Sequence, residues 1–253
     1  LVIATTVLVQ GLSGGPIAAL LGVRRRSDTG YIVVGANALG RALGHAIGAA
    51  GEEIVLVDNN AAEVQVAEAE GLPVILGSAN EDGPLIRADI EGRHGFITVT
   101  TNEGLNLLLA RRAKEVFRVP RTYVTVHRAK AGIQPSHVRE AGAAVLFGGP
   151  INVQRWIHRV RHRTVLTQRW RYAGEAAADE FPKGPDGTPL RGLLPLVITR
   201  RGTTMPVDDE TRIQPGDVVT LLIQRKAAAG TRERLLASGW EPIPSDDSAQ
   251  AAS

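Results

Sequence analysis

The sequence predicts an α/β protein in which a doubly wound parallel sheet is followed by a small α+β subdomain. Three observations predict this fold class. Between residues 31 and 149, short apolar runs alternate with helical patterns. The first run ends at a glycine turn that leads directly into a helix. Beyond residue 164 the alternation gives way to short strands, prolines and turns, which is typical of a separate subdomain.

The first strand is expected at residues 31–34, a β-branched apolar run that stops at Gly35. From Leu39 the apolar residues recur with a helical period, and Gly51 then ends the helix as a C-cap does. This segment is therefore a strand, a glycine turn and a helix in direct succession.

Asp58 stands at the carboxyl end of the next expected strand, residues 54–57. Its distance from Gly35 is that of a Rossmann-like dinucleotide-binding unit, in which the acid accepts a hydrogen bond from a ribose 2′-hydroxyl. No Arg or Lys follows Asp58 closely, so NAD(H) or another adenine nucleotide with an unphosphorylated ribose (AMP, ADP or ATP) is favoured over NADP.

The glycine turn only partly matches the phosphate-binding fingerprint G-x-G-x-x-G. Backbone N–H groups at a helix N-terminus must approach the pyrophosphate closely, and Asn37 stands where the second glycine is expected. Two interpretations remain open: a nucleotide site, or a purely structural βαβ unit without a cofactor. The residues of the fingerprint are Gly35, Ala36, Asn37, Ala38, Leu39 and Gly40.

Composition excludes several classes of function. The chain of 253 residues has no cysteine, which rules out disulfides, cysteine-based zinc sites and thiol nucleophiles. Its net charge of +3 is spread along the sequence and only 4% of residues are aromatic, so no nucleic-acid partner is expected.

Residues 1–23 contain no charged residue and are followed directly by Arg24, Arg25 and Arg26. This pattern predicts the end of a transmembrane domain, with a linker at residues 24–30 on the cytoplasmic side. Because glycines and a proline interrupt the apolar run, a buried helix of a soluble protein is the alternative.

Residues 6–13 followed by Pro16 resemble the end of the last transmembrane helix of monovalent cation:proton antiporters, where Q-G-L-T/S leads to a proline. The part that follows resembles the RCK domain (regulator of K+ conductance, with TrkA-N and TrkA-C parts), a nucleotide-sensing module attached to potassium channels and antiporters. The resemblance implies that the Gly35 turn and Asp58 hold the nucleotide.

The resemblance implies further nucleotide contacts after later strands. Ser78 stands where RCK domains usually carry an acid in Gly-Asp-Ala, and Asn106 completes a stretch similar to the family's Thr-x-x-x-x-Asn. Helix capping is the other interpretation of the polar residues near Asn106. Arg128, after the fifth strand, is placed to meet a phosphate or to remain solvated. These additional candidates are Asn59, Gly77, Ser78, Ala79, Thr100, Thr101, Asn102 and Arg128.

Residues 150–165 are expected to form an amphipathic helix. In RCK domains the corresponding helix crosses to a second subunit, which implies a homodimer; packing on its own domain is the alternative. His158 and His162 have the spacing of a metal pair, but without a third ligand no metal is expected. The apolar stripe of this helix consists of Val153, Trp156, Ile157 and Val160.

Residues 166–240 resemble the C-terminal RCK subdomain, and residues 241–253 are expected to be a flexible tail. Residues 194–199 and 203–205 read as a hairpin, and Pro215-Gly216 as a tight turn before another strand. The acidic residues 208–210 lack metal geometry and are expected to be a solvated loop.

These observations predict the cytosolic regulatory domain of a Na+ or K+:proton antiporter, joined in the same polypeptide to its transport domain at an inner or plasma membrane. Residues 24–253 would lie on the cytoplasmic side. An NAD-dependent oxidoreductase is the main alternative, but no Tyr-x-x-x-Lys pair or other acid/base pair stands out, so no catalytic residue is assigned. A soluble Trk-type potassium-uptake regulator is the third candidate.

Overall fold

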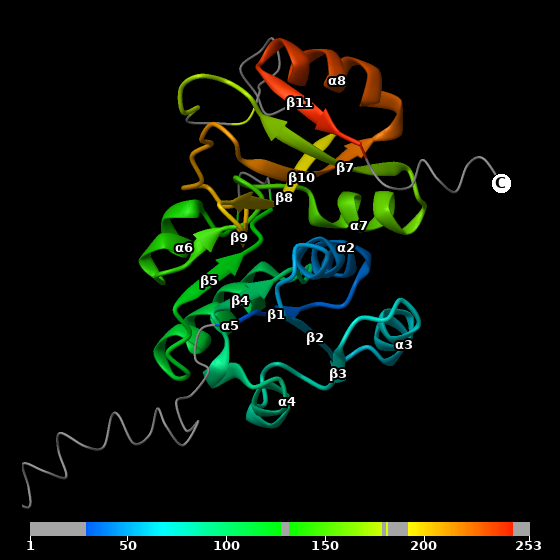
Figure 1. The fold of residues 1–253 in the computed structure, drawn as a ribbon. Coiled ribbons are helices and arrows are strands. Elements are labelled where there is room, and N and C mark those ends of the chain that lie inside the picture. Colours follow the sequence, from blue (N-terminus) through cyan, green and yellow to red (C-terminus); the bar gives the residue numbers. More distant parts are fainter. Residues whose placement is uncertain (1–28, 128–131, 179–180, 182–191, 245–253) are drawn as a thin grey trace, which may run out of the picture.

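The computed structural model describes residues 29–127, 132–178, 181 and 192–244. They form a parallel-sheet lobe (residues 29–149) and an antiparallel lobe (residues 165–244), which Figure 1 shows stacked on one another. Within these ranges no helix combines the length and the apolar character needed to cross a membrane. The predicted membrane segment, residues 1–23, and Arg128 lie outside the described residues.

Six parallel strands form the sheet of the first lobe, in the order β3-β2-β1-β4-β5-β6. The chain winds outward from β1 to β3 and then returns to β4 on the other side of β1, which confirms the predicted doubly wound sheet. The strands are β1 (Tyr31–Val34), β2 (Ile54–Asp58), β3 (Val74–Leu76), β4 (Gly95–Thr98), β5 (Arg121–Val124) and β6 (Ala144–Val145).

Helices cover both faces of this sheet because alternate residues of each buried strand point to opposite faces. Tyr31 and Val33 of β1 pack in one cluster with α2, while Ile32 and Val34 pack in another with α4 and α5. The helical elements of the lobe are α2 (Ala38–Gly48), α3 (Ala61–Ala69), α4 (Asp82–Arg87), the short 3₁₀ helix η1 (Ile90–Gly92), α5 (Glu103–Glu115) and α6 (Pro135–Glu140).

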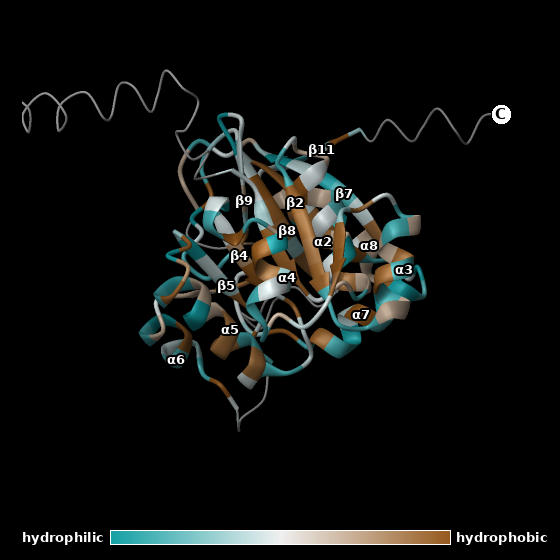
Figure 2. Ribbon diagram, turned by 90° about the horizontal axis from the view of Figure 1, so that it is seen from below, coloured by the Kyte–Doolittle hydropathy of each residue, from teal (hydrophilic) through white to brown (hydrophobic). Residues whose placement is uncertain are grey.

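The second lobe is an antiparallel sheet in the order β11-β7-β10-β8-β9. One face packs on α8 around Trp170 and Leu235, and the other contributes Leu194, Val197 and Leu222 to the cluster of α2. In Figure 2 the strands β2 and β8 are largely hydrophobic. The elements are β7 (Val165–Tyr172), β8 (Leu193–Arg200), β9 (Thr203–Pro206), β10 (Val218–Gln224), η2 (Arg225–Ala227), α8 (Ala228–Ala237) and β11 (Trp240–Ile243).

The amphipathic helix α7 (Val153–Arg161) joins the two lobes. Its stripe lies against α2 of the same chain: Val153 and Trp156 are buried, and Ile157 and Val160 pack against the same cluster. The structure therefore shows the alternative, in which this helix packs on its own chain. Assembly into a homodimer stays a prediction.

Two expectations for the second lobe need correction. The tail begins later than residue 241, because Glu241, Pro242 and Ile243 pair with β7 as part of β11. Asp209 is not solvated: its side chain is 13% exposed, binds Arg139 at 2.7 Å and accepts a hydrogen bond from the Val145 N–H at 2.8 Å. Asp209 is largely shielded from solvent by these contacts between the lobes, which the local sequence does not encode.

The predicted hairpin and tight turn are confirmed. Strands β8 and β9 pair antiparallel, and Gly216 of the turn has φ +87°, a conformation that favours glycine. The turn is held by Asp217, which is 1% exposed and binds Arg200 through both carboxylate oxygens at 2.7 and 2.8 Å. This contact raises the pKa of the Arg200 guanidinium above its usual value.

Candidate nucleotide site at the carboxyl edge of the parallel sheet

The carboxyl ends of β1 to β5 meet at one edge of the sheet, because all of these strands are parallel and in register. The register pairs Val34 with both Val57 and Thr98, so the turns that follow these three strands are neighbours. The order of strands reverses here, and open α/β sheets bind ligands at such a switch point.

Two glycines allow the turn after β1 to pack closely. Gly35 has φ +109°, and its N–H donates to the Val57 carbonyl at 2.9 Å. A Cβ atom on Gly40 would lie 1.9 Å from the Gly35 carbonyl oxygen, so only glycine fits at this point of α2. The first and last glycines of the fingerprint thus have the steric roles expected of a phosphate-binding turn.

Asn37 caps the helix from inside the turn. Its Oδ1 accepts hydrogen bonds from the N–H groups of Leu39 at 3.0 Å and Gly40 at 3.2 Å, and its Nδ2 donates to the Val99 carbonyl at 2.8 Å. Asn37 has an extended backbone (φ −62°), so glycine is not needed here for conformational reasons. The amide side chain therefore satisfies donors that would otherwise be available to a phosphate.

Asp58 links the glycine turn to the start of α3. Its Oδ2 accepts a hydrogen bond from the Ala36 N–H at 2.6 Å, and its Oδ1 accepts one from the Asn60 N–H at 2.8 Å. Each carboxylate oxygen has a second lone pair, so the half-buried Asp58 retains the capacity to accept from a ribose hydroxyl. Asn59, next to it, is exposed.

The turn after β3 follows Asp58 at the same edge of the sheet. The Gly77 N–H donates to the Asp58 carbonyl at 2.9 Å, and the Ser78 hydroxyl accepts from the Asn80 N–H at 3.3 Å. Ala79 is buried in the core with Leu85. The half-buried Ser78 therefore closes a local turn, and its contact with a nucleotide stays a prediction.

Asn106 organises the turn after β4. It is fully buried; its Oδ1 accepts from the Thr100 hydroxyl at 2.6 Å, and its Nδ2 donates to the Thr125 hydroxyl at 2.9 Å. Asn102 caps α5 by accepting from the Leu105 N–H at 3.0 Å, the alternative that capping preferences predicted. Thr101 is exposed.

The end of β5 brings His127 to the same edge. Its backbone N–H donates to the Glu103 carboxylate, while its Nε2 is buried and has no hydrogen-bond partner among the described residues. Glu103 was not among the sequence candidates; its place in the first turn of α5 was the available signal.

Arg41 is the other contributor that sequence reasoning missed. Its guanidinium is 8% exposed, donates to the Ala36 carbonyl at 2.6 Å, and pairs with Glu63 at 2.7 Å and Glu70 at 3.0 Å. No local signal marked it, because helical spacing places Arg41 on the face of His45 and Gly48, opposite the apolar residues of α2. Glu63 also pairs with Arg161 of α7, so the glycine turn is connected to the helix between the lobes.

The fold and this edge define a class, the nucleotide-binding βαβ domains. Gly35, Gly40 and Asp58 lie together as that class requires, and the backbones of Ala36, Ala38 and Leu39 complete the turn while their side chains are buried. No group of three metal-ligating side chains occurs in the described part of the chain.

Comparison with known proteins gives one family match. Residues 31–147 match the TrkA-N domain family, so the match extends over the parallel-sheet lobe and stops before α7. No curated protein matches the sequence.

Several solved structures are similar to this chain. The TrkA-N domain of the inner membrane protein ybaL from Escherichia coli is 18% identical, with a TM-score of 0.42 over 53% of this chain and 95% of that one. An NAD(P)-binding domain of an exopolyphosphatase-related protein from Archaeoglobus fulgidus is 21% identical, with a TM-score of 0.41 over 53% and 98%. The GsuK RCK domain is 15% identical, with a TM-score of 0.41 over 84% of this chain but only 47% of its own.

Proposed function

We propose that this chain is the cytosolic, nucleotide-sensing regulatory region of a monovalent cation (Na+ or K+):proton antiporter and gates its ion transport. Two observations support this. Residues 31–147 match the TrkA-N family, and residues 6–16 resemble the end of an antiporter's last membrane helix. The membrane partner is then the transport domain of the same polypeptide, and residues 24–253 lie on the cytoplasmic side of the inner or plasma membrane.

The proposed ligand is an adenine nucleotide, NAD(H) or AMP, ADP or ATP. One observation carries this assignment: the Asp58 carboxylate lies 2.6 Å from the Ala36 N–H, so the acid and the glycine turn form a single constellation. The ribose would hydrogen-bond to the free lone pairs of Asp58, and the phosphates would lie beside the turn between Gly35 and Gly40.

Calorimetric titration of the chain with NAD, NADH, AMP and ATP tests the ligand class. Asp58→Ala should weaken binding tenfold or more, because a charged hydrogen bond to a ribose hydroxyl contributes about 1.5–3 kcal/mol. Glu115→Ala is the matched control, since it removes a carboxylate that pairs with Arg111 in the last turn of α5, the end of that helix farther from the carboxyl edge. Absence of binding by all four nucleotides at millimolar concentration would contradict the proposal and leave the βαβ unit a structural role.

Asn37→Gly gives a more specific test of the same site. The substitution frees the N–H groups of Leu39 and Gly40 and completes the G-x-G-x-x-G fingerprint. Nucleotide affinity should therefore rise in the same titration. An affinity that falls would show that the ligand binds through the Asn37 side chain.

Regulation requires that the nucleotide prefer one of two arrangements of the protein. A ten- to hundredfold preference corresponds to about 1.4–2.8 kcal/mol, enough to change the population of a gate substantially. The nucleotide should therefore change ion exchange by the full-length protein in vesicles. Inserting a long Gly/Ser segment between Asp28 and Thr29 should abolish this response and preserve basal exchange, whereas an undiminished response would rule out mechanical coupling through the linker.

A further inference from the structure

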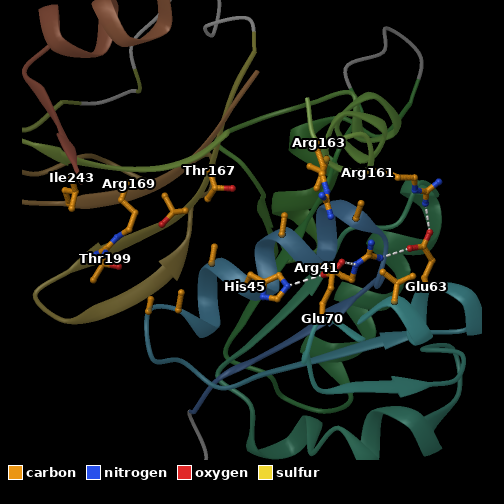
Figure 3. A pocket seen from close by; sticks show the side chains of 18 of the residues that line it. Arg41, His45, Glu63, Glu70, Arg161, Arg163, Thr167, Arg169, Thr199 and Ile243 are labelled. Atoms are coloured by element: carbon orange, nitrogen blue, oxygen red, sulfur yellow. Dashed lines mark hydrogen bonds and ion pairs between the residues drawn. The ribbon is translucent and has the colours of Figure 1, made fainter. Parts of the chain in front are cut away.

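A groove of about 900 Å³ lies between the two lobes, on the side of α2 that faces the antiparallel sheet. One wall is α2 with the neighbouring α3, and the other is the face of the antiparallel sheet (Figure 3). We call it the interlobe groove. It runs along α2 from Ala38 to beyond the end of the helix at Ala50, whereas the Gly35 turn lies before the helix begins.

The helix wall contains an apolar strip, and Arg41 and His45 of α2 line the groove beside it. Ala42, Ala46, Ala49 and Ala50 line it at intervals that place them on one face of a helix, and Val66 of α3 extends this surface. Alanine side chains are short, so they leave the space between helix and sheet open. A planar or apolar group fits against such a wall.

The sheet wall is polar. Strand register brings Ile243, Arg169 and Thr220 into one row across β11, β7 and β10, so their side chains share a face. Thr167 and Thr199 also line the groove, and Figure 3 shows Arg169 beside Thr199. Hydroxyl groups and a guanidinium are the donors that bind carboxylates and phosphates.

The charges that line the groove are not balanced. Of its four arginines, Arg41 and Arg161 pair with the two glutamates, Glu63 and Glu70. The side chains of the other two, which are exposed, make no ion pair or hydrogen bond with any residue that the structure describes; they are Arg163 and Arg169. Two unpaired positive charges therefore face a concave surface that contains an apolar strip. Such a surface attracts an anion.

We propose that the interlobe groove binds a small organic anion at a second site. The apolar body of the ligand lies on the alanines of α2, and its carboxylate or phosphate group contacts Arg169 and the threonine hydroxyls of the sheet. Arg163 adds a second positive charge. The proposal does not depend on nucleotide binding at the Gly35 turn.

Calorimetry with 1-naphthyl phosphate and 1-naphthoate tests the site with both kinds of acidic group on the same apolar body. At least one should bind with a submillimolar Kd, whereas uncharged 1-naphthol and inorganic phosphate should bind at least tenfold more weakly. Arg169→Ala should weaken binding about tenfold. Arg171→Ala, on the same strand and face but outside the groove lining, is the matched control and should not.

Amide chemical shifts should locate the 1-naphthyl anion at residues 42–50 of α2 and not at Gly35 or Asp58. Equal weakening by Arg169→Ala and Arg171→Ala, or equal binding of 1-naphthol, would overturn the proposal. A change of oligomeric state in Arg169→Ala, measured by light scattering, would also overturn it, because a second copy of the chain would then occupy the groove.

Discussion

The Gly35 turn precedes α2 and the interlobe groove runs along this helix, and the two regions differ in how their polar groups are satisfied. In the turn, the N–H groups of Ala36, Leu39 and Gly40 already donate to side chains of the same chain. In the groove, the side chains of Arg163 and Arg169 make no ion pair or hydrogen bond with the described residues. A ligand at the turn must replace internal hydrogen bonds, whereas a ligand in the groove adds new ones.

This difference shows that a sequence fingerprint for binding can stabilise the fold itself. Asn37 and Asp58 hold the turn together, because each accepts hydrogen bonds from its backbone N–H groups. Arg41 belongs to both regions: it binds the Ala36 carbonyl of the turn and lines the groove. Substitutions in the turn, at Arg41 and between the lobes test this difference between the turn and the groove.

The largest effect is expected for Gly40→Ala. Its Cβ would lie 1.9 Å from a backbone oxygen that cannot move without disrupting β1, so the free energy of unfolding should fall by about 3 kcal/mol or more. Gly48→Ala, in the last turn of the same helix, has only Ile54 at 4.0 Å and should be neutral or stabilise by up to about 1 kcal/mol. Urea denaturation measures both, and similar losses in the two variants would contradict a close approach at Gly40.

A smaller loss is expected for Arg41→Met. The substitution removes a buried cation and leaves the Ala36 carbonyl and Glu70 with fewer partners, so stability should fall by about 2–3 kcal/mol after allowance for the partial exposure of Glu70. The matched control is Arg111→Met, which breaks an exposed pair with Glu115 and should change stability little. Equal effects on the denaturation midpoint would show that Arg41 is not a link between turn and groove.

The smallest effect concerns Tyr31, whose hydroxyl donates to the Thr204 carbonyl at 3.1 Å across the lobes. Burial, followed by the charges of Tyr123 and Glu52, raises the pKa of Tyr31 well above its usual value. The folded state therefore keeps this proton at a pH where the unfolded state has lost it, and stability falls as pH rises beyond about 10. The fall is at most about 1.4 kcal/mol per pH unit for each such group.

Tyr31→Phe should lower stability by about 1 kcal/mol at pH 8 through the lost hydrogen bond, and should then lose less between pH 9 and 11 than the wild type. Burial also raises the pKa of Tyr123. This residue therefore keeps part of the pH dependence of stability in both proteins. Guanidinium denaturation across this pH range measures the slopes. Identical slopes would show that Tyr31 does not join the lobes through a buried, neutral hydroxyl.

Much of the parallel-sheet lobe was predictable from the sequence, because its signals are local. An apolar run, a glycine turn and a helical period within residues 31–50 specify β1 and α2 without reference to the rest of the chain. The spacing between Gly35 and Asp58 also predicted that this acid lies at the turn, where the structure has it. Strand β7 and helix α8, where charged residues interrupt the apolar pattern, were not predicted as elements because such patterns are weak without tertiary contacts.

The sequence by itself therefore determined the order of strands and helices in the parallel-sheet lobe, the glycine turn and the place of its acid. Only the tertiary structure decided that Asn37 satisfies the donors of that turn, that the stripe of α7 packs on α2, and that Arg41 is buried. It also decided that Arg169 faces the alanines of α2. The physical reason is distance along the chain: backbone preferences act between near neighbours, whereas ion pairs and grooves join residues that only packing brings together.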